Sequence, residues 1–234
     1  MKAVVLAAGK GTRLRPLTHF LPKVMIRIKG KPVLEYHLDQ LARAGIRDIY
    51  INLHYLPDKT KSYFDDGSKW GIRIQYSYEP TVLGTAGAVK KLEAELGDDP
   101  FLVVYGDNFL EMDYEKFIDF SESNEGIGAV AVFEKDDVTE CGILEVGKRG
   151  RILRFMEKPN PSEAFSHWAN AGIFYFRKRI FSYVGPGYSD FGYDVLPRIL
   201  KAGETLVAYK LKTQVWGIDN LESLMKLEEL NSGE

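Results

Sequence analysis

Apolar and polar positions alternate along the first part of the chain with two distinct spacings. Residues 2–8 form a nearly continuous apolar run, which is typical of a strand covered on both faces. After Pro32, apolar side chains recur at helical spacing until Gly45, so a helix is expected between these residues. Residues 48–53 are β-branched and aromatic and predict the next strand.

The same alternation continues as far as residue 121. Further strands are expected at residues 72–76 and 101–105, and further helices at residues 58–65, 86–96 and 113–121. A repeated strand–helix order favours an α/β fold with a mixed, mostly parallel sheet that is flanked by helices.

The second half of the chain is richer in short strands. Turn-forming residues such as Gly147 and Gly150 separate them. The pattern predicts strands at residues 127–133, 142–146, 152–155 and 172–176, and helices near residues 190–201 and 219–230. No low-complexity linker interrupts the chain, so a single domain over residues 1–234 with a smaller β-rich portion is expected.

Composition narrows the class of protein. The 234 residues have 45% hydrophobic side chains and a formal net charge of −2, which gives no support for a nucleic acid or an anionic membrane as partner. No apolar run approaches the roughly 20 residues needed to span a bilayer. The apolar N-terminus turns into a glycine loop and is therefore interpreted as a strand, not a signal peptide. Cys141 is the one cysteine, which excludes an intramolecular disulfide, and a cytoplasmic protein is expected.

A glycine loop follows the first strand. Glycines at the carboxyl end of a strand let backbone N–H groups approach phosphate oxygens, and Arg13 adds a charged donor. A plain glycine turn beside a solvated arginine is the alternative. A dinucleotide fingerprint is excluded because Leu14 stands where it needs a third glycine, and a P-loop is excluded because Gly11 follows Lys10.

The longer stretch Leu6–Thr18, followed by Pro22-Lys23, resembles the signature of sugar-1-phosphate nucleotidyltransferases. The resemblance covers roughly residues 1–231 and implies a Rossmann-like catalytic domain, with residues 1–125 mainly binding nucleotide and residues 126–234 mainly binding sugar phosphate. It implies that Arg13 holds the leaving pyrophosphate and that Lys23 contacts the triphosphate. The nucleotide-binding residues that it implies in this stretch are Leu6, Ala7, Ala8, Gly9, Gly11, Thr12, Arg13 and Lys23.

Residues 83–88 resemble the base-binding loop of the same family, which implies nucleotide contacts by Gly84 and Thr85. A simple helix start with small residues for packing is the alternative. Glu79 lies upstream and is a candidate acceptor for base N–H donors, its alternative being an exposed carboxylate before Pro80.

Two aspartates are candidate ligands for Mg²⁺, which prefers carboxylate and phosphate oxygens. Asp107 ends a strand and matches the metal-binding and catalytic aspartate of the family, and it would also contact the nucleotide. Asp219 fits the position of the second metal-binding aspartate, although the Gly-Thr-Pro that many members have there is missing. Asp219 is alternatively the N-cap of a helix that begins near Leu221.

The sugar-phosphate site is implied by matches in the second half. Lys158 would hold the nucleophilic phosphate and Glu157 would bond sugar hydroxyls. A plain strand end with a solvated lysine is the alternative. The full set of residues implied for sugar phosphate is Asn108, Gly142, Glu157, Lys158 and Asn170.

The resemblance implies an enzyme that condenses an NTP with a sugar 1-phosphate, releases pyrophosphate and serves NDP-sugar biosynthesis. The sequence looks most similar to mannose-1-phosphate guanylyltransferases. Relatives that use glucose, heptose or N-acetylmuramate 1-phosphate with UTP, dTTP or CTP remain open. A non-catalytic sugar-nucleotide sensor and a glycosyltransferase are rivals from other classes. The family often forms dimers, so a homodimer is possible.

Overall fold

The computed structural model describes residues 1–232, which group into two compact units. The first unit contains Met1–Val82, Val104–Met112 and the chain from Val215 onward; the second contains Leu83–Val103 and Asp113–Gln214. Residues 233–234 of the predicted domain lie outside the described residues. The division of function between residues 1–125 and 126–234 stays a prediction, and the units group the chain differently.

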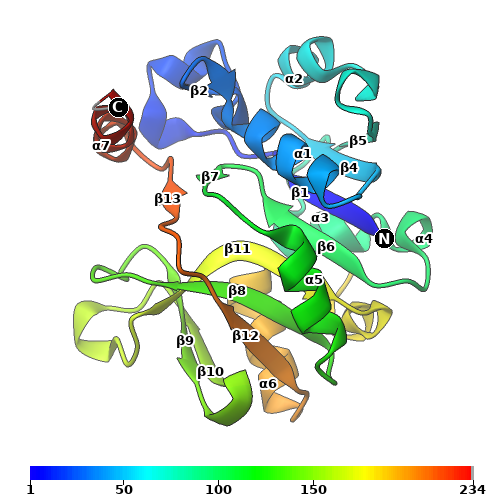
Figure 1. Cartoon of the computed structure of the whole chain (residues 1–234), viewed down its shortest axis with the longest axis vertical. Helices are drawn as coiled ribbons and strands as arrows, with labels where there is room; N and C mark the ends of the chain where they lie inside the picture. Colours follow the sequence, from blue (N-terminus) through cyan, green and yellow to red (C-terminus); the bar gives the residue numbers. More distant parts are fainter. Residues whose placement is uncertain (233–234) are drawn as a thin grey trace. The chain divides into compact units, whose positions relative to one another are not determined.

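The first unit is built on parallel strands with helices beside them (Figure 1). Its main strands are β1 (Lys2–Leu6), β4 (Asp48–Leu53) and β5 (Arg73–Tyr78). Its short strands pair as β2 (Arg27–Ile28) with β3 (Lys31–Pro32) and β7 (Asn108–Phe109) with β13 (Trp216–Gly217). Its helices are α1 (Val33–Arg43), α2 (Pro57–Phe64) and α7 (Leu221–Ser232).

The hydrophobic pattern explains these elements. Residues 3–5 of β1 and residues 49–53 of β4 are buried, because helices and loops cover both faces of these strands. The helical repeat after Pro32 puts Leu34, Leu38 and Leu41 on the inner face of α1, where all three are fully buried. Gly45 follows α1 with a φ of +76°, which suits the end of a helix.

A second apolar cluster joins the beginning and the end of the chain within the first unit. Leu14, Ile26, Ile28 and Val33 pack there with residues from the C-terminal segment, Ile218, Leu224 and Leu227. Packing of α7 against the residues after the glycine loop fixes where the residues just before α7 lie.

The second unit is mainly β-structure with helices on two sides. Its strands are β8 (Gly128–Glu134), β9 (Gly142–Val146), β10 (Ile152–Glu157), β11 (Trp168–Phe176) and β12 (Leu206–Lys210). Strand β8 pairs antiparallel with β11 and parallel with β12, and β9 pairs antiparallel with β10. Its helices are α3 (Gly84–Lys90), α4 (Glu93–Leu96), α5 (Tyr114–Glu122) and α6 (Leu196–Lys201). Figure 1 shows α5 in front of one end of β8, and α6 behind β12.

The predicted fold class, a mixed and mostly parallel sheet flanked by helices, is confirmed. Strand β6 (Phe101–Tyr105) has the predicted bounds; its first three residues belong to the second unit and its last two to the first. In the part of the chain that the structure describes, no helix combines the length and apolarity that crossing a membrane requires.

Some element boundaries differ from the prediction. The helix predicted at residues 86–96 is two helices, because the chain leaves helical hydrogen bonding around Leu92. The strand predicted from Gly172 begins at Trp168, and a bulge between Asn170 and Phe174 interrupts its pairing with β8. Strand β12 was not predicted.

Candidate functional site

The glycine loop after β1 is held by side chains from the same unit. The N–H of Ala7 donates to Asn52 Oδ1 (2.6 Å), and the Thr18 hydroxyl donates to the carbonyl of Gly11 (2.7 Å). Gly11 has a φ of +58°, and a side chain there would press on Thr18 and Lys23. The following turn, Thr12–Leu14, buries Leu14 and leaves Arg13 exposed. The loop is thus a fixed turn that presents an arginine.

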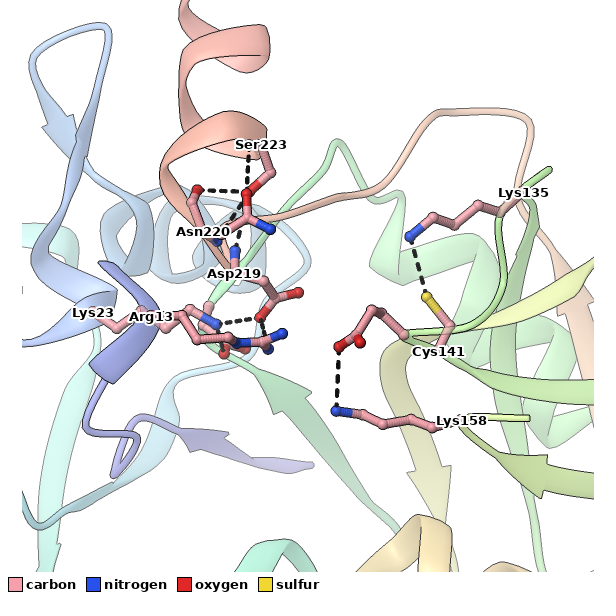
Figure 2. Close-up of polar contacts among 10 residues, drawn as sticks. Arg13, Lys23, Lys135, Cys141, Lys158, Asp219, Asn220 and Ser223 are labelled. Carbon is pink, nitrogen blue, oxygen red and sulfur yellow. Dashed lines mark hydrogen bonds and ion pairs between the residues drawn. The ribbon is translucent and has the colours of Figure 1, made fainter. Parts of the chain in front are cut away.

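Four charged side chains of the first unit meet beyond this turn (Figure 2). The Lys23 ammonium donates to Asp107 Oδ2 (2.5 Å) and to Asp219 Oδ1 (2.8 Å). Arg13 Nη2 donates to the same oxygen of Asp219 (3.3 Å). Residues that are 84 to 206 positions apart in sequence therefore form one network of two cations and two carboxylates.

Lys23 is the buried centre of this network, with only 9% of its side chain exposed. Burial by itself would lower its pKa, but Asp107 and Asp219 outweigh burial and raise the pKa above 10.5. Lys23 therefore stays charged at neutral pH and holds two carboxylates together.

The helix-cap interpretation of Asp219 is wrong, because Asn220 caps α7. The N–H of Ser223 donates to Asn220 Oδ1 (2.9 Å), and the N–H groups of Asp219 and Asn220 both donate to Ser223 Oγ (3.2 Å each). This reciprocal arrangement is a capping box. It leaves the Asp219 carboxylate directed to Lys23 and Arg13 (Figure 2).

The carboxylates suit a divalent cation whose other ligands come from a substrate. Among the residues that the structure describes, no group of three or more His, Cys, Asp or Glu side chains could hold a metal ion. Magnesium commonly binds through one or two carboxylates plus phosphate oxygens and water. Asp107 and Asp219 each bring an oxygen within hydrogen-bond distance of one ammonium group, so the pair fits that donor set.

Glu79 is fully buried, so its alternative interpretation as an exposed carboxylate is wrong. Its Oε1 accepts a hydrogen bond from Asn52 Nδ2 (2.8 Å), and Asn52 in turn holds the N–H of Ala7. The sequence analysis missed Asn52, whose signal is a polar side chain inside an otherwise apolar strand. In this structure Glu79 supports the glycine loop through Asn52.

In the second unit, residues 83–87 lie against residues 187–191. The carbonyl of Ser189 accepts the N–H groups of Ala86 (2.9 Å) and Gly87 (3.0 Å), and the N–H of Ser189 donates to the carbonyl of Leu83 (2.9 Å). The predicted nucleotide residues Gly84 and Thr85 are half-buried at the start of α3.

The predicted sugar-phosphate residues Gly142, Glu157 and Lys158 lie together where β9 meets β10. Gly142 pairs with Glu157 across the two strands, and a side chain at Gly142 would collide with Phe155 and Glu157. Lys158 has a φ of +45°, and its ammonium lies 3.6 Å from Glu140 (Figure 2). A positive φ is uncommon for a residue other than glycine, and 41% of the Lys158 side chain is exposed.

The other two predicted sugar-phosphate residues lie on other strands. Asn170 is on β11 and its Oδ1 accepts the N–H of Gly172 (2.9 Å), so it stabilises the bulge. Asn108 is on β7 in the first unit, and its carbonyl contacts Nε2 of His37 (2.6 Å).

Two titratable groups have strongly shifted pKa values. Burial lowers the pKa of His37 to about 4, so this histidine is neutral at physiological pH. Burial first, and Asp190 second, raise the pKa of Glu157 to about 7, while Lys158 lowers it. The Glu157 carboxyl is therefore partly protonated near neutral pH.

Comparison with known proteins places the chain in a family. The family model described as nucleotidyl transferase matches residues 2–229. A UTP–glucose-1-phosphate uridylyltransferase from Synechocystis sp. is 36% identical over 87% of this chain and 56% of its own length. A mannose-1-phosphate guanylyltransferase from Mycobacterium tuberculosis is 30% identical over 92% of this chain and 59% of its own length.

A solved structure shares the fold. A UDP-glucose pyrophosphorylase structure complexed with UDP-glucose superimposes with a TM-score of 0.84 at 22% identity, covering 99% of this chain and 98% of that one. The chain spans little more than half the length of the two curated relatives. On the family match and its extent, this chain belongs to the nucleotidyl transferase family.

Proposed function

We propose that the chain is a sugar-1-phosphate nucleotidyltransferase that condenses an NTP with a sugar 1-phosphate and releases pyrophosphate. The observation that carries the proposal is the network of Arg13, Lys23, Asp107 and Asp219 beside the glycine loop. Attack on the α-phosphorus builds negative charge on the oxygen that leaves with pyrophosphate. Two fixed cations beside a glycine loop suit that charge, and no covalent enzyme intermediate is needed.

Within this proposal Arg13 and Lys23 have different parts. Arg13 is half exposed, which suits a donor that reaches the leaving pyrophosphate. Lys23 is buried and fixed by two carboxylates, which suits a cation that stays in place during the reaction. The backbone from Leu6 to Thr12 would line the phosphates, because the loop is held from behind by Asn52 and Thr18.

Asp107 and Asp219 are the proposed ligands of Mg²⁺. When bound with the nucleotide, the ion would neutralise phosphate charge and polarise the α-phosphoryl group. The residues themselves prepare that place, since the Lys23 ammonium contacts both carboxylates and holds them close together before any ligand arrives.

The sugar phosphate is assigned to Lys158 and Glu157. A cation is needed for the nucleophilic phosphate, because two anions otherwise repel one another, and the side chain of Lys158 is partly exposed. Glu157 is partly buried over Gly142 and offers a carboxyl group to sugar hydroxyls. Gly84 and Thr85 are proposed to contact the base through their backbone.

The preferred substrates are mannose 1-phosphate and GTP, which fit the names of several relatives, including the mycobacterial one. Glucose 1-phosphate with UTP or dTTP is the second candidate, and the name of the Synechocystis relative supports the pair with UTP. Heptose or N-acetylmuramate 1-phosphate and CTP are further candidates on resemblance alone. A homodimer and a cytoplasmic location stay predictions.

The non-catalytic sensor is a weaker proposal. A sensor has no need for both metal-ligand candidates and both phosphate cations, and this chain connects all four in one hydrogen-bonded network. A glycosyltransferase is weaker still, because Gly106-Asp107-Asn108 lacks the Asp-x-Asp of such enzymes.

Pyrophosphate release measured on a grid of NTPs against sugar 1-phosphates tests the proposal. We expect turnover that requires Mg²⁺, an NTP and a sugar 1-phosphate together, with mannose 1-phosphate and GTP fastest. Specific binding of sugar nucleotides without pyrophosphate release from any pair would support the sensor and contradict the proposal.

A further inference from the structure

Thr85 is predicted to serve the nucleotide, yet its side chain is used within the second unit. Its hydroxyl donates to Asp190 Oδ2 (2.9 Å) and accepts the N–H of Phe191 (2.8 Å). Both hydrogen-bonding directions of the hydroxyl are therefore occupied by the segment that follows Ser189. A threonine in these contacts holds two chain segments together.

Asp190 is the centre of a compact turn. Its Oδ1 accepts the N–H groups of Gly192 (2.8 Å) and Tyr193 (3.1 Å), and its own N–H donates to Asp194 Oδ2 (2.8 Å). This cap starts a π-helical turn (Phe191–Val195), a rare conformation that is often associated with function. The carboxylate of Asp190 thus fixes the backbone of Gly192 with one oxygen and Thr85 with the other.

The Glu157 carboxylate rests on that same backbone. A side chain at Gly192 would collide with the carboxyl group of Glu157, so Gly192 and Glu157 are in close contact. Asp190 is also near enough to contribute to the raised pKa of Glu157, after burial. Movement of the turn would therefore move the surface that supports Glu157.

The turn has a rigid support. The ring of Phe191 stacks on Phe174 and Phe176, with ring centres 5.4 and 5.2 Å apart. On its other side, Gly84 and Gly87 pack so closely on residues 187–189 that a side chain at either position would collide with their backbone. Shifts at α3 are therefore transmitted to the turn and are not absorbed by loose packing.

We propose that Asp190 is a positioning residue that couples the loop at Gly84–Thr85 to Glu157, so that the Thr85 hydroxyl governs sugar-phosphate affinity. The inference rests on the proposed function, in which Gly84 and Thr85 contact the base through their backbone and Glu157 contacts the sugar. Binding of a nucleotide at α3 then sets the turn for the second substrate. In this proposal the Thr85 side chain positions the turn at Asp190 and does not contact the nucleotide.

The test compares Thr85→Val, which keeps the shape but removes the hydroxyl, with wild type and Thr85→Ser. Thr85→Val removes both hydrogen bonds of the hydroxyl, to Asp190 and from Phe191. We expect it to raise the KM for the sugar 1-phosphate at least about tenfold, because the bond to the charged Asp190 carboxylate alone is worth about that factor. The KM for the NTP should change less than about twofold, and Thr85→Ser should restore the wild-type value. Thr60→Val is the matched control, since the Thr60 hydroxyl is buried and has no partner among the described residues.

A rise in the KM for the NTP, or no change in either KM, would overturn the proposal. A ligand-free readout separates this failure from failure of the proposed function. Carboxyl-carbon NMR titration of Glu157 should show its pKa near 7 in wild type and clearly lower in Asp190→Asn, which removes the negative charge that raises this pKa. Lys158 is the cation that faces Glu157 in both proteins. An unchanged Glu157 pKa in Asp190→Asn would contradict the coupling even if the chain catalysed no transfer.

Discussion

At the scale of single residues, Lys23 explains why distant parts of the sequence carry one site. A buried ammonium needs partners, and Asp107 and Asp219 supply them from positions 84 and 196 residues away. The lysine is thereby held in one conformation, and the carboxylates are brought together despite their like charge. Substitutions in this network are therefore expected to affect chemistry more than folding where the shape and the remaining ion pair survive.

The substitution Asp107→Asn tests the metal assignment. Asparagine is a poorer magnesium ligand of the same shape, so the rate should fall at least about 100-fold, and excess chelator should abolish turnover of wild type. Lys23 keeps its contact with Asp219, so the fold should persist. Steady-state rates across a magnesium titration provide the measurement, with Asp136→Asn, an exposed aspartate outside the predicted site, as control. Full activity of Asp107→Asn would remove Asp107 from the reaction.

Alanine at Arg13 and at Lys158 should impair different substrates. Arg13→Ala removes the side chain proposed to donate hydrogen bonds to the leaving pyrophosphate, and it should raise the KM for the NTP by about tenfold or more. Lys158→Ala removes the ammonium group proposed to bind the phosphate of the sugar 1-phosphate, and it should raise the KM for that substrate by a similar factor. Both side chains are partly exposed, so stability should change little. Intact sugar-phosphate binding by Lys158→Ala would exclude Lys158 from that site.

The raised pKa of Glu157 makes stability depend on pH. An acid whose pKa is about 7 in the folded chain and about 4.5 when unfolded favours folding while protonated. This contribution is complete below about pH 4.5 and is lost as the pH rises to about 7. Glu157→Gln should therefore melt at a higher temperature than wild type at pH 8 and at a similar temperature at pH 4.5. Equal differences in Tm at the two pH values would show that burial of Glu157 does not disfavour its charge.

At the scale of elements, two neighbouring residues at the start of α7 have different roles. The sequence left Asp219 open as either a metal ligand or the N-cap of the helix. Asn220 caps the helix and Asp219 faces Lys23 and Arg13. Asn220→Ala should lower stability by about 0.5–2 kcal/mol while largely keeping turnover at saturating magnesium. Asp219→Asn should melt close to wild type but require more magnesium and turn over more slowly.

Thermal denaturation and magnesium titrations of both variants check this expectation. A large loss of stability in Asp219→Asn with normal magnesium dependence would return Asp219 to a structural role. Rescue of Asn220→Ala stability by Asn220→Ser would confirm that the cap, and not another contact, was lost.

The elements also show how far sequence reasoning reaches. Strand β6 has the predicted bounds, because its continuous apolar run is buried on both faces of the sheet. The division of residues 84–96 into α3 and α4 at Leu92 was not predicted, and neither was the bulge in β11, where Gly172 has a φ of +74° and donates to Asn170 Oδ1. The apolar spacing along the sequence does not show such local departures from regular hydrogen bonding.

At the scale of the whole molecule, the fold class and the family followed from sequence pattern and motif. The candidate phosphate and metal residues were also named from sequence, but their connections were not. Three of these connections depend on long-range packing. Lys23 donates to both aspartates, Asn52 donates to Glu79, and Thr85 donates to Asp190. These residues lie up to 196 positions apart, and no local spacing encodes such contacts.

The central claim is transfer of a nucleoside monophosphate from an NTP to a sugar 1-phosphate, and phosphorus NMR of the reaction mixture tests it most directly. With magnesium, GTP and mannose 1-phosphate, or the pair selected by the substrate grid, the α-phosphorus signal of the NTP should convert to that of a sugar diphosphate diester. Pyrophosphate should appear in a one-to-one ratio with that product, and neither should form when the sugar phosphate is left out. Hydrolysis of the NTP at the same rate with and without sugar phosphate, with no diphosphate diester formed, would contradict the account.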